Sequence, residues 1–304
     1  MVACMNGVHE VAGSNPVSPK TGTSLVPVFS SWGKEDTVRS TSLVTIIPGL
    51  VSFETDMATL HCFPLSRDFS LYPRPLSPLP LHYTLQRQRL APVTRETVRS
   101  GWYTWHADVY AYDRPFVAGR LGLQISPDRT ITCTPAFARI PFSIGGIRTA
   151  GELVFGQIAW DLFKAGYMLL RGCAWQDGKG RVQALVMPGM NGKTTLVASI
   201  LGRDPDSLLI AEDLLVCKPV DAGVEIVPTA PFYKNQGRNA NRNLKQHSGR
   251  ICTGEKPLVA EHLFFATNST AGQAWTAREG LDFALTNGLF FLHDPLISLR
   301  LLVE

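Results

Sequence analysis

A candidate phosphate-binding loop lies in the stretch ALVMPGMNGKTTLVASIL at residues 184–201. Binding nucleotide phosphates requires convergent backbone N–H groups, a lysine that reaches the β and γ oxygens, and a following hydroxyl that holds Mg²⁺; the typical spacing is G-x-x-x-x-G-K-[ST] between a strand and a helix. Gly192, Lys193 and Thr194 supply the last three positions, and Gly189 gives the loop flexibility. We therefore expect ATP to be bound by Gly189, Met190, Asn191, Gly192, Lys193, Thr194 and Thr195.

The first glycine of this pattern is replaced by Met187. The context nevertheless agrees with the pattern, because an apolar strand is expected before the loop and an apolar helix after it. The alternative is a tight turn that carries a surface lysine, and we favour phosphate binding over it.

An acidic pair, Glu212-Asp213, follows in the segment LLIAEDLLV, about twenty residues after Lys193. Phosphoryl transfer needs a carboxylate that binds Mg²⁺ directly or through water, and a hydroxyl acceptor also needs a base. Adjacent side chains at the end of a strand point to opposite faces. One acid is thus expected to serve the metal and the other the acceptor; the alternative is a solvated turn with two charges.

Apolar patterning predicts the elements that position these residues. Two strands joined by a turn at residues 176–180 are expected to form a hairpin. A further strand over 207–219 is expected to turn at the acidic pair. Gly166 is expected to end a helix that begins near residue 151. The full set is strands over 168–175, 181–187, 207–219, 223–231 and 258–266, and helices over 195–202, over 281–292 and within 151–170, the last of which Gly166 is expected to end.

The chain before residue 151 divides into two regions of different composition. Alternating polar and apolar residues over 102–140 predict several short antiparallel strands within a β-rich part, 98–150. Residues 1–97 are rich in Ser, Pro and Thr and are expected to be irregular or disordered. One hypothesis for 1–97 is that the natural start lies later, at Met57, and the alternative is a native tail. The phosphate-loop domain is expected to occupy 151–304.

Composition excludes several classes of protein. With 304 residues, 45% of them hydrophobic, the chain can bury a core, and a net charge of +4 does not by itself indicate nucleic acid. No stretch approaches the roughly 20 apolar residues of a membrane helix. Six scattered cysteines without a C-x-x-C pair argue against a zinc site or disulfide scaffold and favour a reducing, cytoplasmic setting; they are Cys4, Cys62, Cys133, Cys173, Cys217 and Cys252.

Residues 153–266 resemble the C-terminal catalytic domain of HPr kinase/phosphorylase and the related serine kinases found beside peptide biosynthesis and exosortase systems. The resemblance is clearest in GYMLLRGCAWQDGKGRVQALVMPGMNGKTTLVASILG, at 166–202, and in LLIAEDLLVCKP, at 208–219. A Lys-Asn pair at Lys234-Asn235 also matches several relatives. The resemblance implies an α/β fold with a mixed sheet, similar to that of phosphoenolpyruvate carboxykinase, in which Mg-ATP phosphorylates a serine.

By position, the resemblance implies that Lys193 contacts the phosphates and Thr194 contacts Mg²⁺. It likewise implies Glu212 as the catalytic base and Asp213 as the acid near the metal. Three departures stand out: Arg171 replaces a histidine of many relatives, the acidic pair is Glu-Asp instead of Asp-Asp, and the acidic residue followed by R-G-x-G is absent. HPr itself is therefore not implied as the substrate.

A basic segment follows over residues 234–250 and contains no acidic residue. It is expected to be a lid that contacts ATP phosphates or docks an acidic peptide. A nucleic-acid contact and a solvated loop are the alternatives. The basic side chains are Lys234, Arg238, Arg242, Lys245 and Arg250.

The sequence therefore predicts an ATP-dependent serine kinase with a protein or peptide acceptor, in which Lys193, Glu212 and Asp213 are catalytic. Thr194 and Asp213 are the expected metal ligands. No membrane or nucleic-acid partner is expected, and relatives of this kind often form homo-oligomers. The alternatives are a kinase of free serine or a sugar, and a module that binds ATP without transferring phosphate.

Overall fold

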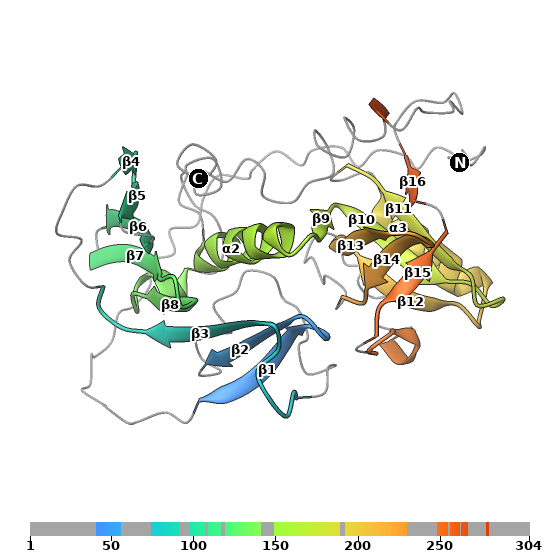
Figure 1. The fold of residues 1–304 in the computed structure, drawn as a ribbon, viewed down its shortest axis with the longest axis horizontal. Coiled ribbons are helices and arrows are strands. Elements are labelled where there is room, and N and C mark those ends of the chain that lie inside the picture. The colour runs from blue at the N-terminus through green and yellow to red at the C-terminus, as the bar shows by residue number, and fades with distance from the viewer. Residues whose placement is uncertain are drawn as a thin grey trace, which may run out of the picture.

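The chain forms a mixed α/β fold that consists mostly of strands, as a computed structural model shows (Figure 1). Two α-helices, α2 and α3, lie within the described residues. The structure describes residues 41–55, 74–90, 98–106, 109–116, 119–140, 149–188, 192–229, 248–254, 256–261, 263–266 and 278–279.

An eight-stranded sheet contains the N-terminal half of the described chain. Its strand order is β1-β2-β3-β8-β7-β6-β5-β4. Strand β3 runs parallel to β2 and to β8, and the other neighbours are antiparallel. The bounds are β1 Ser42–Ile47, β2 Val51–Thr55, β3 Leu81–Arg87, β4 Val98–Ser100, β5 Tyr103–His106, β6 Val109–Phe116, β7 Gly119–Ile125 and β8 Thr130–Cys133. The antiparallel strands predicted over 102–140 are thus confirmed.

The expectation of irregular structure throughout residues 1–97 is wrong where β1, β2 and β3 occur. Side chains of these strands are fully buried, among them Ile46, Phe53 and Tyr83. Their short apolar runs lie between proline-rich segments, and burial against the rest of the sheet supplies the stability that local pattern does not. A chain starting at Met57 would lack β1 and β2 and the core side chains they contribute.

Helix α2, Ala150–Lys164, connects the eight-stranded sheet to the phosphate-loop region (Figure 1). Thr149 and Glu152 form a capping box at its start. At its end the N–H of Gly166 donates to Phe163 and that of Tyr167 to Leu162, a Schellman arrangement in which Gly166 adopts a φ of 84°. The predicted helix and its termination at Gly166 are confirmed.

Two four-stranded sheets follow, with strand orders β12-β10-β11-β16 and β15-β14-β13-β9. The first is mixed, as expected, because β11 is antiparallel to β10 and parallel to β16. The chain passes between the two sheets after β9, after β12 and after β15. The bounds are β9 Met168–Leu170, β10 Gly172–Gln176, β11 Val182–Val186, β12 Leu208–Glu212, β13 Leu215–Val220, β14 Gly223–Val227, β15 Leu258–Ala260 and β16 Leu263–Phe265.

One hydrophobic core joins the eight-stranded sheet to the rest of the molecule. It contains buried side chains of β1–β3 and β6–β8, the inner face of α2, and residues of the second small sheet. Leu214, Val216 and Val227 are its members nearest the acidic pair. The helix predicted over 281–292 lies outside the described residues.

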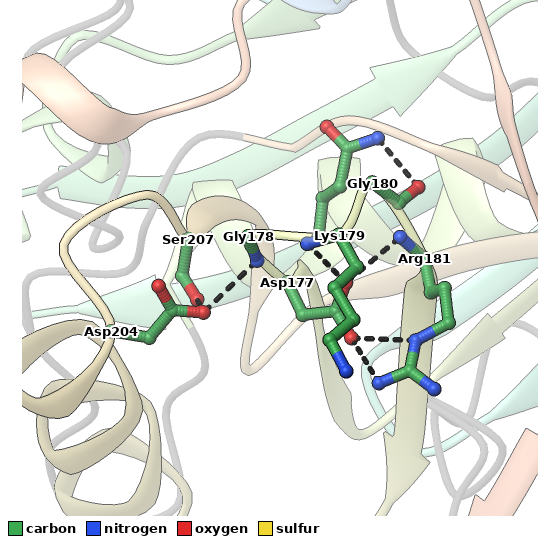
Figure 2. Close-up of polar contacts among 8 residues, drawn as sticks. Asp177, Gly178, Lys179, Gly180, Arg181, Asp204 and Ser207 are labelled. Carbon is green, nitrogen blue, oxygen red and sulfur yellow. Dashed lines mark hydrogen bonds and ion pairs between the residues drawn. The ribbon is translucent and has the colours of Figure 1, made fainter.

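The C-terminal end of helix α3, Lys193–Arg203, is fixed to its surroundings by polar contacts (Figure 2). Its C-cap Asp204 accepts hydrogen bonds from the N–H of Gly178, in the β10–β11 turn, and from the hydroxyl of Ser207. These hydrogen bonds lower the pKa of the Asp204 carboxyl, and the bond from Ser207 has the largest effect. The turn itself is closed by an ion pair between Asp177 and Arg181.

Arg250, in the 3-10 turn η3 (Ser248–Arg250), is the one described residue among the predicted basic side chains of 234–250. Its guanidinium donates to the main-chain carbonyls of Leu201, Asp204 and Pro205. A cation that binds carbonyls at a helix C-terminus also interacts favourably with the helix dipole. The structure thus gives Arg250 a role in anchoring α3. Residues 234–247 of the lid predicted over 234–250 lie outside the described residues.

Arg250→Ala is expected to lower the free energy of unfolding by about 1–2 kcal/mol, because three carbonyls lose a charged donor. Denaturant unfolding followed by circular dichroism measures this. Arg203→Ala, which removes an exposed cation from the last turn of the same helix, is the matched control and should change stability by less than about 0.5 kcal/mol. Equal midpoints for the two variants would contradict the anchoring role.

Candidate functional site

The predicted phosphate loop stands between the end of β11 and the start of α3. The N-cap of α3 is Gly192, which has a left-handed φ of 81° that favours glycine and contributes no side-chain cap of its own. Lys193, Val197 and Leu201 are buried on one face of the helix. Val197 and Leu201 pack there on side chains of β10 and β12. This packing positions the lysine against the carbonyls of Met187 and Pro188 at the end of β11.

The ammonium group of Lys193 is held by the end of β11 and by the acidic pair. Its Nζ donates to the carbonyl oxygens of Met187, at 3.2 Å, and Pro188, at 2.7 Å. It also lies 3.5 Å from Oδ1 of Asp213. Only 4% of the Lys193 side chain is exposed. The alternative interpretation of a surface lysine on a tight turn is therefore wrong.

Both members of the acidic pair are buried at the point where the chain leaves β12. The hydroxyl of Thr194 donates to Oε1 of Glu212, and Asp213 pairs with Lys193. Asp213 has a left-handed φ of 62°, which aspartate tolerates better than most residues. The alternative interpretation of a solvated acidic turn is wrong, since Glu212 is 1% and Asp213 4% exposed.

Met187 forms the base of the loop at the position where the pattern has glycine. Its side chain is buried, its N–H donates to the carbonyl of Arg171, and its own carbonyl accepts from Lys193. Arg171 is the bend between β9 and β10. The side chain of Met187 thus packs inside, and only its main-chain groups contact Lys193 and Arg171. The size of the methionine side chain therefore does not obstruct the contact to Lys193.

The structure brings together four of the predicted site residues: Lys193, Thr194, Glu212 and Asp213. Gly192 lies beside them as the N-cap of α3, and Thr195 is exposed in the first turn. Gly189, Met190 and Asn191 lie outside the described residues, and their predicted role in binding phosphate stays a prediction.

Cys173 is a neighbour of this site that the sequence did not reveal. It lies in β10 directly opposite Glu212 of β12 and is fully buried. Burial, together with the charge of Glu212, raises the pKa of the Cys173 thiol to about 12. The pairing of β10 with β12 is a long-range contact, and nothing in the local pattern around Cys173 indicates it. Cys173 therefore lines the site as a neutral thiol.

Cys173 is expected to resist alkylation by iodoacetamide up to about pH 9 in the folded chain, since only the thiolate reacts and burial blocks access. Because the pKa of the Cys173 thiol is raised in the folded state, the buried neutral thiol makes its whole contribution to the free energy of unfolding below the thiol pKa of the unfolded chain. That contribution is lost as the pH rises toward 12. Peptide mass spectrometry measures the labelling. Cys252, which is partly exposed, is the internal control. Labelling of Cys173 as fast as Cys252 would contradict this environment.

The donor set suits Mg²⁺ held together with a nucleotide. Mg²⁺ prefers oxygen ligands and is usually bound by one or two carboxylates plus substrate phosphates and water. Thr194, Glu212 and Asp213 supply a hydroxyl and carboxylates of this kind. Within the described residues, no group of three or more His, Cys, Asp and Glu side chains could hold a metal by itself.

No protein-family model matches the chain, and no curated protein matches it significantly. None of the helices in the described part of the chain has the length and hydropathy needed to cross a membrane.

Proposed function

We propose that this chain is an ATP-dependent kinase that transfers the γ-phosphoryl group of Mg-ATP to a serine hydroxyl of a protein or peptide. The observation that carries the proposal is the buried cluster of Lys193, Thr194, Glu212 and Asp213 where α3 meets the end of β12. An ammonium group, a hydroxyl and two carboxylates are the groups that phosphoryl transfer needs.

Lys193 binds and orients the β and γ phosphates in this proposal. Its partners include two neutral carbonyls and the carboxylate of Asp213. Phosphate oxygens are expected to replace the carbonyls, because a hydrogen bond between an ammonium group and an anionic oxygen joins two charged partners. The low exposure of the site strengthens the electrostatic interaction with charge that develops during transfer.

The two buried carboxylates divide two tasks, one toward Mg²⁺ and one toward the acceptor hydroxyl. When bound, Mg²⁺ neutralises the charge on the β and γ oxygens. Thr194 and one acid orient that cation, while the other acid takes the hydroxyl proton. The two acids are adjacent in the chain, at the short connection between β12 and β13, which supports a shared role at one site.

The serine acceptor rests on the resemblance of residues 166–219 to HPr-kinase-like serine kinases. Free serine or a sugar is the alternative acceptor for the same chemistry. A cytoplasmic setting is part of the proposal, and the free thiols of Cys133, Cys173, Cys217 and Cys252 support it. Homo-oligomer formation is proposed only from the resemblance.

A degenerate library of serine-containing peptides tests the activity, with radiolabelled Mg-ATP and the full chain. We expect label in phosphoserine for the wild type and none for the double variant Glu212→Gln, Asp213→Asn, which should still bind ATP. Label in free serine or a sugar instead would move the acceptor to the alternative class. ATP binding without transfer to any of these would favour the non-catalytic module.

A further inference from the structure

We infer that the two acids divide their tasks in the opposite sense from the one implied by the resemblance. Glu212, together with Thr194, is the carboxylate that holds Mg²⁺, and Asp213 accepts the proton of the acceptor hydroxyl. This inference rests on the proposed function and assigns roles within its site.

The contact between Glu212 and Thr194 indicates which acid is close to the metal. In phosphate-loop enzymes the hydroxyl after the lysine is a Mg²⁺ ligand. Oε1 of Glu212 accepts a hydrogen bond from that hydroxyl. A hydroxyl and a carboxylate that contact each other lie close enough for one Mg²⁺ to be bound by both. A cation on Thr194 is therefore within direct or water-mediated reach of Glu212.

The backbone holds Glu212 in this position. It is the last residue of β12, with Cys173 of β10 directly opposite, and it is almost fully buried. A carboxylate fixed on a strand beside the first turn of α3 suits a metal ligand, since Mg²⁺ requires near-ideal geometry.

The ion pair between Asp213 and Lys193 indicates which acid is close to the transferred group. The lysine of a phosphate loop reaches the β and γ oxygens. Oδ1 of Asp213 lies 3.5 Å from Nζ of Lys193. Asp213 is thus placed on the side of the transferred group, where the acceptor oxygen must approach in line. Asp213 follows β12 with a left-handed φ, and its carboxylate contacts Lys193, whereas that of Glu212 contacts Thr194.

Phosphoryl transfer forms one bond to the γ-phosphorus and breaks another. The acceptor oxygen forms a bond to the γ-phosphorus while its proton passes to a carboxylate oxygen of Asp213. The bond from that phosphorus to the β–γ bridging oxygen breaks, and ADP leaves with the electron pair. Asp213 later releases its proton to water.

Fluorescence titration of the full chain with mant-ATP, in Mg²⁺ and in EDTA, tests the metal assignment without any acceptor. We expect Mg²⁺ to tighten binding to the wild type and this gain to fall at least about 10-fold in Glu212→Gln. Asp213→Asn should keep the gain and lose transfer to the serine-peptide library. Where an amide variant does not fold, the variant that keeps the charge, Glu212→Asp or Asp213→Glu, takes its place. Glu212→Asp should partly restore the Mg²⁺ gain, and Asp213→Glu should partly restore transfer.

A Mg²⁺ gain that is lost in Asp213→Asn and kept in Glu212→Gln would overturn the inference and restore the opposite assignment. Equal losses in both variants would overturn the division of tasks. Absence of mant-ATP binding by the folded wild type would instead overturn the proposed function, and the inference with it.

Discussion

Lys193→Ala is expected to lower the rate of phosphoryl transfer by on the order of 10³-fold. The ammonium of Lys193 is buried beside Asp213 and is directed at the carbonyls that end β11, where the phosphates are expected to bind. Alanine removes the positive charge that would meet the charge developing on the transferred group. Water cannot replace it well, because the position is almost completely enclosed.

The rate is measured as phosphoserine formed in the peptide library at saturating Mg-ATP. Lys179→Ala is the matched control, since Lys179 is exposed in the β10–β11 turn and only its main-chain N–H bonds to Asp177. The control should transfer phosphate at the wild-type rate. A folded Lys193→Ala variant with a rate within about 10-fold of wild type would contradict the role given to Lys193.

Phe53→Ala is expected to lower the free energy of unfolding by about 3–5 kcal/mol. Phe53 lies in β2, is fully buried, and packs edge-on against Tyr83 of β3 with ring centroids 5.2 Å apart. Truncation removes this aromatic contact and leaves a cavity between two neighbouring strands of the eight-stranded sheet. The effect would establish that chain preceding Met57 belongs to the folded core.

Phe163→Ala is the control for Phe53→Ala, because the same substitution on α2 removes a side chain that is 59% exposed. Its cost should stay below about 1 kcal/mol, as for most surface changes. Urea unfolding of the full chain, followed by tryptophan fluorescence, measures both. If the two variants unfold at the same urea concentration, β2 is not part of the core.

Local patterns predicted the helix α3 and the hairpin of the phosphate-loop region, but the strands expected over 168–175 and 258–266 are wrong as single strands. The structure divides them into β9 and β10 and into β15 and β16, which lie in different sheets. Gly166 ends α2 through a turn that glycine adopts easily, and the apolar runs on either side of residues 176–180 form the hairpin β10–β11. The acidic pair could be placed at the end of a strand for the same reason. The mixed character of the sheet was implied by the resemblance.

Contacts between distant segments could not be predicted in this way. The strands β1–β3 are short and lie among prolines, and their stability comes from burial against α2 and the rest of the sheet. The pairing of Cys173 with Glu212 and the contact of Arg250 with the end of α3 join segments 39 and about 50 residues apart. A period of 2 or 3.6 residues carries no information about such contacts.

Thermal unfolding of the full chain with increasing Mg-ATP tests the central claim most directly. The full chain is required, because β1–β3 contribute to the core. At about 100 times its dissociation constant, a ligand stabilises the folded state by about 2.7 kcal/mol, which raises Tm by roughly 4 °C for a chain of this size. We expect this rise in the wild type and its loss in Lys193→Ala. A folded wild type whose Tm does not change with Mg-ATP would contradict nucleotide binding at this loop.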